Sequence, residues 1–195
     1  REITPVPNKR DPNHVGLARD ESPRPNSTVE RLGRIAPVWG SKTITAGNAP
    51  GVNDGAAVMV LASEERAARL PRKPLARIVG WAEAATKPAE FPVASAHAIK
   101  KLLTRTGLGI DDISVIEVNE AFACVPLICG QELNWDPDRV NRKGGSVAMG
   151  HPIGASGARL ILTAAYQLQE LGERYAVAAI CSGTGQGDAI LLDPA

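Results

Sequence analysis

Three short segments carry most of the side chains in this chain that can do chemistry. They read NEAF at 119–122, GHPIG at 150–154 and CSGTGQG at 181–187. Each is predicted to follow a strand or to open a helix. In layered α/β folds the loops at strand ends meet on one rim, where catalytic groups converge. The sequence therefore offers a carboxamide, an imidazole and a thiol as candidates for one common site.

His151 lies in a loop that Pro152 stiffens and that Gly150 and Gly154 flank. Glycines at such positions let the backbone approach a ligand closely. The imidazole titrates near neutral pH and can act as a general base. The alternative is a histidine that only caps the following helix.

Cys181 ends a predicted strand and precedes three glycines in alternation. Its thiol would be presented at a turn whose backbone amides can stabilise a developing oxyanion. The alternative is a buried structural cysteine in a glycine hairpin. Asn119 likewise has two interpretations, because it can cap the helix that follows it or can hold a water molecule or a substrate carbonyl.

The remaining cysteines and histidines receive no catalytic role. Cys124 and Cys129 fall inside an apolar helical pattern and are interpreted as core residues. His97 is predicted on the solvent side of its helix, and His14 lies in a polar leader. Because His, Cys and acidic residues do not recur at ligand spacing, we expect no metal site.

Composition limits the kind of partner to expect. The 195 residues are 44% hydrophobic and 22% charged, as in ordinary globular proteins, and the net charge of +1 gives no reason to expect nucleic acid or an acidic membrane. No apolar stretch is long enough to cross a bilayer, and no signal peptide is recognised at the start. Three cysteines without a paired CxxC pattern indicate reduced thiols, so we expect a cytoplasmic protein whose ligand is a small molecule or another chain.

Strands and helices are predicted to alternate after a proline-rich stretch of about 40 residues that has no convincing period. Strand composition occurs at 43–46, 75–85, 113–118, 175–181 and 188–192, and helices are predicted after the turn 47–55 to about residue 70, at 93–106, at 120–133, and from the glycine-rich segment 144–157 to 171. The last helix carries a polar stripe at Arg159, Thr163, Tyr166 and Glu170 and should otherwise be buried. This alternation predicts an α/β layered fold in which helices pack on both faces of a mixed sheet.

Four motifs in the same order closely resemble the thiolase family. The family's coenzyme A loop and helix are similar to TAGNA at 45–49 with NDGA at 53–56, and its NEAF motif is similar to VNEAFA at 118–123. GG at 144–145 with GHPIGASG at 150–157 resembles the GHPxGxSG signature, and CSG at 181–183 resembles the final CxG. The resemblance covers nearly the whole chain and is loosest over the first forty residues.

The resemblance implies an acyl-CoA C-acyltransferase that forms or cleaves a carbon–carbon bond between acyl-CoA thioesters through an acyl-cysteine. In that chemistry His151 would activate the nucleophilic cysteine and, with a water held by Asn119, bind a thioester oxygen. Cys181 would move the proton at the α-carbon, and the Gly183 amide would contribute to a second oxyanion hole. Coenzyme A or acyl-CoA would be bound as a substrate near Ala49, Pro50 and Phe122, and no permanently bound cofactor is implied.

Some features depart from the family pattern. Family members are about twice as long and carry the acylated cysteine in a CxSG-like segment of their first half, and this sequence contains no such segment. Pro50 replaces a common serine near the pantetheine, and Thr184 replaces a usual glycine. Residues 1–71 would then be the closing part of an incomplete N-terminal thiolase domain, and 72–195 a C-terminal domain.

Two functions follow as alternatives. In the first, the chain supplies the His/Cys acid-base half of a thiolase, needs an N-terminal half from the same protein or a separate chain, and belongs to a homo- or hetero-oligomer. In the second, it is a non-catalytic thiolase-like subunit that binds acyl-CoA or lipid or serves as a scaffold.

Overall fold

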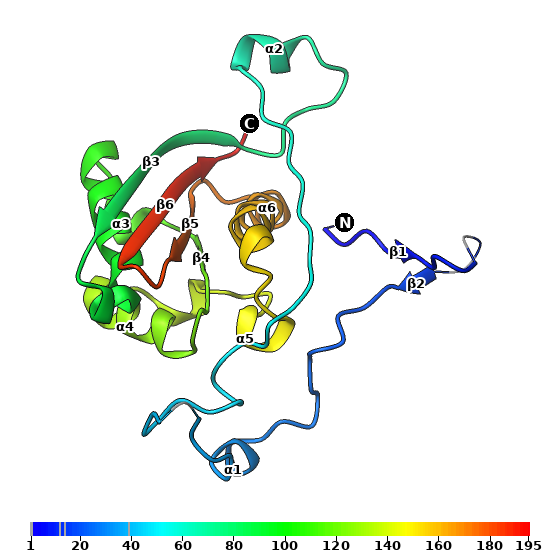
Figure 1. Ribbon diagram of the computed structural model, residues 1–195. Coiled ribbons are helices and arrows are strands. Elements are labelled where there is room, and N and C mark those ends of the chain that lie inside the picture. The colour runs from blue at the N-terminus through cyan, green and yellow to red at the C-terminus, as the bar shows by residue number, and fades with distance from the viewer. Residues whose placement is uncertain (1, 12, 14, 39) are drawn as a thin grey trace.

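A four-stranded mixed sheet organises the second part of the chain (Figure 1). The structure is a computed structural model that describes residues 2–11, 13, 15–38 and 40–195. The strands are β3 (Arg77–Ala85), β4 (Val115–Val118), β5 (Ala176–Cys181) and β6 (Gln186–Asp193), in the spatial order β3-β6-β5-β4. Only the β4–β5 pair is parallel, while β6 runs antiparallel to both β5 and β3. The predicted mixed sheet is therefore confirmed.

Helices cover both faces of this sheet (Figure 1). One face packs against α3 (Phe91–Thr106) and α4 (Cys124–Leu133), and the other packs against α6 (Ile153–Leu171). Gly107 and Gly172 end α3 and α6 in the left-handed conformation, with φ of 71° and 66°, as the sequence predicts for glycine C-caps. The three layers confirm the α/β fold class.

Alternation along β5 divides the core in two. Val177, Ala179 and Cys181 join the cluster under α3 and α4, whereas Ala176 and Ala178 join the cluster under α6. Successive side chains of a strand point to opposite faces, so this is the pattern of a strand that is covered on both sides. The thiol of Cys181 consequently faces the α3 and α4 side of the sheet.

The first seventy residues are mostly extended and run around the outside of the layered part (Figure 1). Their regular elements are a two-stranded pair, β1 (Val6–Pro7) with β2 (Val15–Leu17), and the short helices α1 (Val29–Leu32) and α2 (Glu64–Ala68). The short helical turns of the remaining chain are η1 (Pro88–Glu90), η2 (Ile110–Asp112), η3 (Pro137–Arg139) and α5 (Ser146–Met149).

Two predicted elements of this first part are wrong. The strand expected at 43–46 is reduced to a single bridge between Pro37 and Thr45. The helix expected up to residue 70 forms only at Glu64–Ala68. Val58 and Val60 are 82% and 88% exposed, so the apolar residues of that segment have no surface to cover. A short helix without a packing partner is marginal in water.

Two predictions for the second part also need correction. The helix expected at 120–133 begins only at Cys124. The polar stripe of α6 does not face water throughout, because Thr163 is buried and donates to the Glu2 carboxylate at 2.7 Å. Arg159 is half-buried and contacts Glu117 of β4. These polar side chains are buried with partners, which sequence periodicity does not reveal.

The packing of α3 on the sheet yields a stability prediction. Leu102 is 1% exposed and packs over Gly80 of β3, whereas Leu127 of α4 is 68% exposed. Leu102→Ala should lower the free energy of unfolding by about 2–5 kcal/mol, because it removes buried methyl groups and leaves a cavity. Leu127→Ala, the matched control, should change it by less than about 0.5 kcal/mol. Urea unfolding of both variants measures the difference, and equal losses would contradict this assignment of the core.

Candidate active site

The parallel pairing of β4 and β5 brings two predicted site residues to one edge of the sheet. Val118 pairs with Ala179, and the backbone N–H of Asn119 donates to the carbonyl of Ala179 at 2.9 Å. Cys181 ends β5 two residues farther on. Since neighbouring strands lie about 4.8 Å apart, Asn119 and Cys181 emerge side by side at the carboxyl ends of these strands.

Asn119 and His151 are joined by a direct side-chain contact. The Asn119 carboxamide nitrogen lies 3.2 Å from His151 Nε2. Asn119 is fully buried, and its oxygen accepts a hydrogen bond from the Ser146 hydroxyl at 2.8 Å. The hydroxyl therefore fixes which end of the carboxamide faces the imidazole, and the end that faces it is the NH₂ group.

The other ring nitrogen of His151 contacts a serine of α6. His151 Nδ1 lies 2.7 Å from Ser156 Oγ, and the Ser156 hydroxyl donates to the Pro152 carbonyl at 3.1 Å. A hydroxyl has one proton, so Ser156 accepts from Nδ1–H. Nε2 then carries a lone pair, which accepts from Asn119. This tautomer presents the basic nitrogen on the side of the sheet edge.

Burial keeps this imidazole neutral. Desolvation, followed by the positive charge of Arg159, lowers the pKa of His151 below its ordinary value of 6.5. At pH 7 the ring is therefore unprotonated and can accept a proton. His97 is half-buried on α3 and takes no part in these hydrogen bonds, and His14 lies outside the described residues.

Cys181 keeps its proton at neutral pH, whereas the imidazole of His151 has a free lone pair. Burial raises the pKa of its thiol to about 11, although the neighbouring Ser95 hydroxyl acts in the other direction. The thiol is therefore protonated at neutral pH and can donate a proton. Cys129 is fully buried, and its pKa is raised to about 12 by burial, which agrees with its interpretation as a core residue. Cys124 is only half-buried because it opens α4.

Gly183 lies in the exposed turn between β5 and β6. The turn is closed by Ser182, whose N–H donates to Gln186 O at 2.8 Å and whose carbonyl accepts from Gly185 N–H at 2.9 Å. Within the described chain the Gly183 amide donates to no other group, so it can donate to a ligand oxygen. The left-handed residue of the turn is Gly185, with φ of 89°, and Thr184 has no positive φ. A side chain at 184 therefore fits without backbone strain.

The segment expected to contact coenzyme A packs beside these residues. Ala49 is buried, and the carbonyl of the preceding Asn48 accepts from Ala123 N–H at 2.9 Å. Pro50 is half-buried. Phe122 is half-buried too, and its ring lies 6.1 Å from that of Phe91. The loop that contains Ala49 and Pro50 is therefore joined to the end of the NEAF segment, to which Phe122 belongs.

Several polar residues that hold the site were not predicted from the sequence. Asn53 accepts from the His151 backbone N–H at 3.3 Å, and Glu120 accepts from Val147 N–H at 2.9 Å at the start of α5. Ser146 and Ser156 orient Asn119 and His151, as described above. The spacing of Ser156, five residues after His151 and in the first turns of a helix, is the one signal that could have revealed a partner for the ring.

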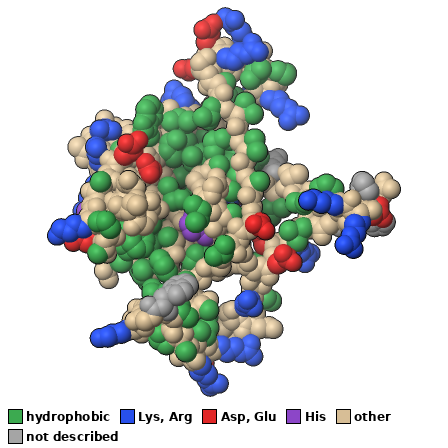
Figure 2. Space-filling model, in the orientation of Figure 1, with side chains coloured by type: hydrophobic (Ala, Val, Ile, Leu, Met, Phe, Trp, Pro, Cys, Tyr) green, Lys and Arg blue, Asp and Glu red, His purple; other side chains and the backbone are tan. Residues whose placement is uncertain are grey.

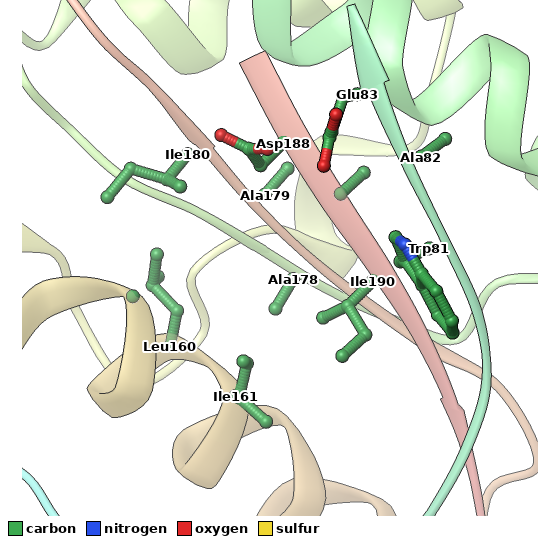
Figure 3. Close-up of a pocket in the computed structure, with 12 residues that line it drawn as sticks. Trp81, Ala82, Glu83, Leu160, Ile161, Ala178, Ala179, Ile180, Asp188 and Ile190 are labelled. Carbon is green, nitrogen blue, oxygen red and sulfur yellow. The ribbon is translucent and has the colours of Figure 1, made fainter.

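An apolar groove lies apart from these groups, between the sheet and α6 (Figure 3). Its walls include Trp81 of β3, Ile190 of β6 and Ile161 of α6, and hydrophobic side chains also gather on this side of the molecular surface (Figure 2). None of the predicted site residues lines the groove. The groove is therefore a surface feature of the sheet and not the reaction centre.

The described chain contains no cluster of three or more His, Cys, Asp or Glu side chains arranged to hold a metal ion. In the same residues, no helix is both long and apolar enough to span a membrane.

Comparison with solved structures shows extensive similarity. Acetyl-CoA acetyltransferase from Bacillus anthracis superimposes with a TM-score of 0.93 at 38% identity, over 99% of this chain and 49% of that chain. Human mitochondrial 3-ketoacyl-CoA thiolase in complex with CoA gives a TM-score of 0.87 at 34% identity, over 98% and 48% of the two chains.

Sequence comparison points the same way. The beta-ketoadipyl-CoA thiolase of Pseudomonas aeruginosa is 47% identical, and the cytosolic acetyl-CoA acetyltransferase of Mus musculus is 40% identical, each over 98% of this chain and 49% of the relative. The chain thus spans about half the length of the curated relatives it matches. The thiolase C-terminal domain model matches residues 72–194 and the thiolase N-terminal domain model matches residues 1–65, so the chain belongs to the thiolase family.

Proposed function

We propose that the chain supplies the acid-base and oxyanion-binding part of an acyl-CoA C-acyltransferase that makes or cleaves 3-ketoacyl-CoA. The observation that carries the proposal is the Asn119–His151 pair, which lies at the sheet edge that also presents Cys181 and the free Gly183 amide. A base, an acid and oxyanion donors are the three requirements of Claisen chemistry on thioesters.

The protonation states support a cleavage step of the following kind. A nucleophilic cysteine adds to the 3-keto carbon, and the bond between C2 and C3 breaks, so that its electron pair goes to the thioester as an enolate. Oxyanion donors stabilise the enolate oxygen, and the neutral Cys181 thiol transfers its proton to the α-carbon. The acyl-cysteine then passes its acyl group to the thiol of coenzyme A, whose proton goes to the Cys181 thiolate. His151 returns to the leaving cysteine the proton that it took when that cysteine first attacked. Condensation is the same sequence in reverse.

The nucleophile is not provided by the other cysteines of this chain. Cys129 is buried, and its sulfur lies 3.5 Å from the Pro92 carbonyl. Burial raises the pKa of Cys124 as well, which disfavours its thiolate. We therefore propose that the acylated cysteine comes from an N-terminal thiolase half, in the same protein or in a separate chain, within a homo- or hetero-oligomer. Residues 1–71 would complete that domain, and 72–195 would form the C-terminal one.

The substrate class follows from the relatives. Their names indicate acetyl-CoA, beta-ketoadipyl-CoA and other 3-ketoacyl-CoA thioesters, so we propose a 3-ketoacyl-CoA for this protein too. Coenzyme A would contact the protein near Ala49, Pro50 and Phe122 and would leave after turnover, as a substrate and not as a resident cofactor. The relatives include proteins named as cytosolic and as mitochondrial, so the cytoplasmic location stays a prediction.

Mass spectrometry of the native assembly after incubation with acetyl-CoA tests the proposal directly. We expect an acetyl group on a cysteine outside residues 1–195. An assembly that binds acetyl-CoA but never becomes acetylated would favour the alternative, a thiolase-like subunit that binds acyl-CoA or lipid or serves as a scaffold.

Replacing the proposed base gives the first functional prediction. His151→Ala in the native assembly should reduce kcat for thiolysis by about 10²- to 10⁴-fold, because it removes the proposed acceptor of the nucleophile's proton. The loss of the absorbance of the 3-ketoacyl-CoA enolate measures the rate. The control is His97→Ala on α3, which should turn over normally. Near-normal turnover by His151→Ala would remove this histidine from the mechanism.

Replacing the proposed acid separates the two halves of the reaction. Cys181→Ser should still allow the partner cysteine to be acylated, since His151 is intact. It should block condensation, because a serine hydroxyl is a much weaker acid and base than a thiol. Acyl adducts are counted by mass spectrometry and condensation by product formation. Cys124→Ser is the matched control, and condensation retained by Cys181→Ser would contradict the α-proton role.

A further inference from the structure

A buried ion pair lies behind the Asn119–His151 pair. The Glu117 side chain of β4 is fully buried between the sheet and α6. Its carboxylate accepts from Gln167 Nε2 at 2.7 Å and from Arg159 Nη1 at 3.2 Å, both on α6. Burying a charged pair requires desolvation that the mutual attraction barely offsets, and well-packed apolar residues often stabilise such a site as well or better. Holding α6 on the sheet is therefore not a sufficient reason for burying Glu117 and Arg159 together.

The second arm of Arg159 points toward the site. Its Nη2 donates to Ser146 Oγ at 3.4 Å. A guanidinium can only donate, so Ser146 accepts from Arg159 and has its own proton left for the Asn119 oxygen, 2.8 Å away. The direction of the first hydrogen bond thus determines the direction of the second.

The hydrogen-bond directions continue as far as the imidazole. With its oxygen occupied by Ser146, Asn119 turns its NH₂ group toward His151 Nε2 at 3.2 Å. An NH₂ group donates, so Nε2 must be unprotonated and Nδ1 must carry the proton that Ser156 accepts. A donor that cannot be deprotonated therefore fixes the tautomer of a histidine three hydrogen bonds away.

We propose that Arg159, anchored by Glu117, is a positioning residue that acts through Ser146 and Asn119 to hold His151 in the tautomer with a basic Nε2. This inference rests on the proposed function, in which His151 is the base. Arg159 touches neither substrate nor the reacting atoms, and its effect is transmitted by the orientation of the Ser146 hydroxyl and the Asn119 amide.

Arg159 has a second, electrostatic effect on the same ring. Its positive charge contributes to the lowered pKa of His151, after desolvation. The groups that face the ion pair are Gln167 on α6 and Glu2 in the N-terminal segment, and burial raises the pKa of Glu117 to about 7. The guanidinium of Arg159 stays charged throughout this pH range, so it continues to disfavour the imidazolium as Glu117 becomes protonated.

These two effects separate experimentally in two variants of the native assembly. Ser146→Ala breaks the hydrogen-bond relay that runs from Arg159 through Ser146 and Asn119 to His151, but it keeps the positive charge of Arg159. The value of kcat for thiolysis should therefore fall about 10- to 100-fold, while the acid limb of kcat/KM against pH stays in place. The double variant Glu117→Gln with Arg159→Met removes relay and charge together and leaves no unpaired buried charge. It should lose a similar factor in kcat, and its acid limb should move to higher pH, because the imidazolium is no longer disfavoured.

A readout that does not need activity completes the test. In assemblies labelled with ¹⁵N-histidine, the ring nitrogen shifts of His151 report which nitrogen is protonated. The wild type should show the Nδ1–H form. Ser146→Ala should show an added share of the Nε2–H form, because the released Asn119 amide can turn its oxygen to Nε2 and the Ser156 hydroxyl can rotate to donate to Nδ1. Ser114→Ala, which removes a surface hydrogen bond to Glu173, is the matched control and should match the wild type in both measurements.

The outcomes distinguish this inference from the proposed function. An unchanged tautomer and unchanged kcat in Ser146→Ala, or an acid limb that does not move in the double variant, would overturn the positioning role while leaving the acyltransferase intact. A wild type without thiolysis would instead refute the proposed function, and the ring nitrogen shifts would still decide whether the relay orients His151.

Discussion

The parallel pairing of β4 with β5 is the constraint on which the site depends. It sets Asn119 beside the end of β5, where Cys181 follows within two residues. The antiparallel return of β6 then requires a tight turn, and that turn leaves the Gly183 amide free to donate. Because α6 crosses the same two strands, the loop before it delivers His151 to the edge. A change of register between β4 and β5 would move Asn119 away from Cys181 and Gly183.

Burial keeps both titratable groups of the site, His151 and Cys181, in their neutral forms at neutral pH. Desolvation disfavours the charged form of each, so it lowers the pKa of His151 and raises that of Cys181. The result at neutral pH is a neutral base and a neutral acid at one edge. Because both groups are neutral, neither needs a fixed counterion in the resting site.

Sequence patterns predicted the layered part well, because its strands and helices bury regular apolar faces and end at glycines. They failed where a polar side chain is buried with a partner. Glu117 looks like the solvent-facing position of an alternating strand, yet all four residues of β4 are buried. Arg159 looks like the exposed stripe of α6, yet it bonds to Glu117 and Ser146. A pattern of residue types cannot show that two charged side chains from distant parts of the sequence are buried against each other.

The same limit explains why the helix predicted up to residue 70 forms only at Glu64–Ala68. Its apolar residues have the composition of a packed helix, but composition does not supply the surface on which to pack, and Val58 and Val60 are exposed. The nearby turn at Asn53 is held for a different reason. The Asn53 side chain bonds to the His151 backbone, and it packs so closely on Gly150 that a side chain at position 150 would collide with it. In this part of the chain, the loop at Asn53 is therefore held by its contact with the backbone of His151.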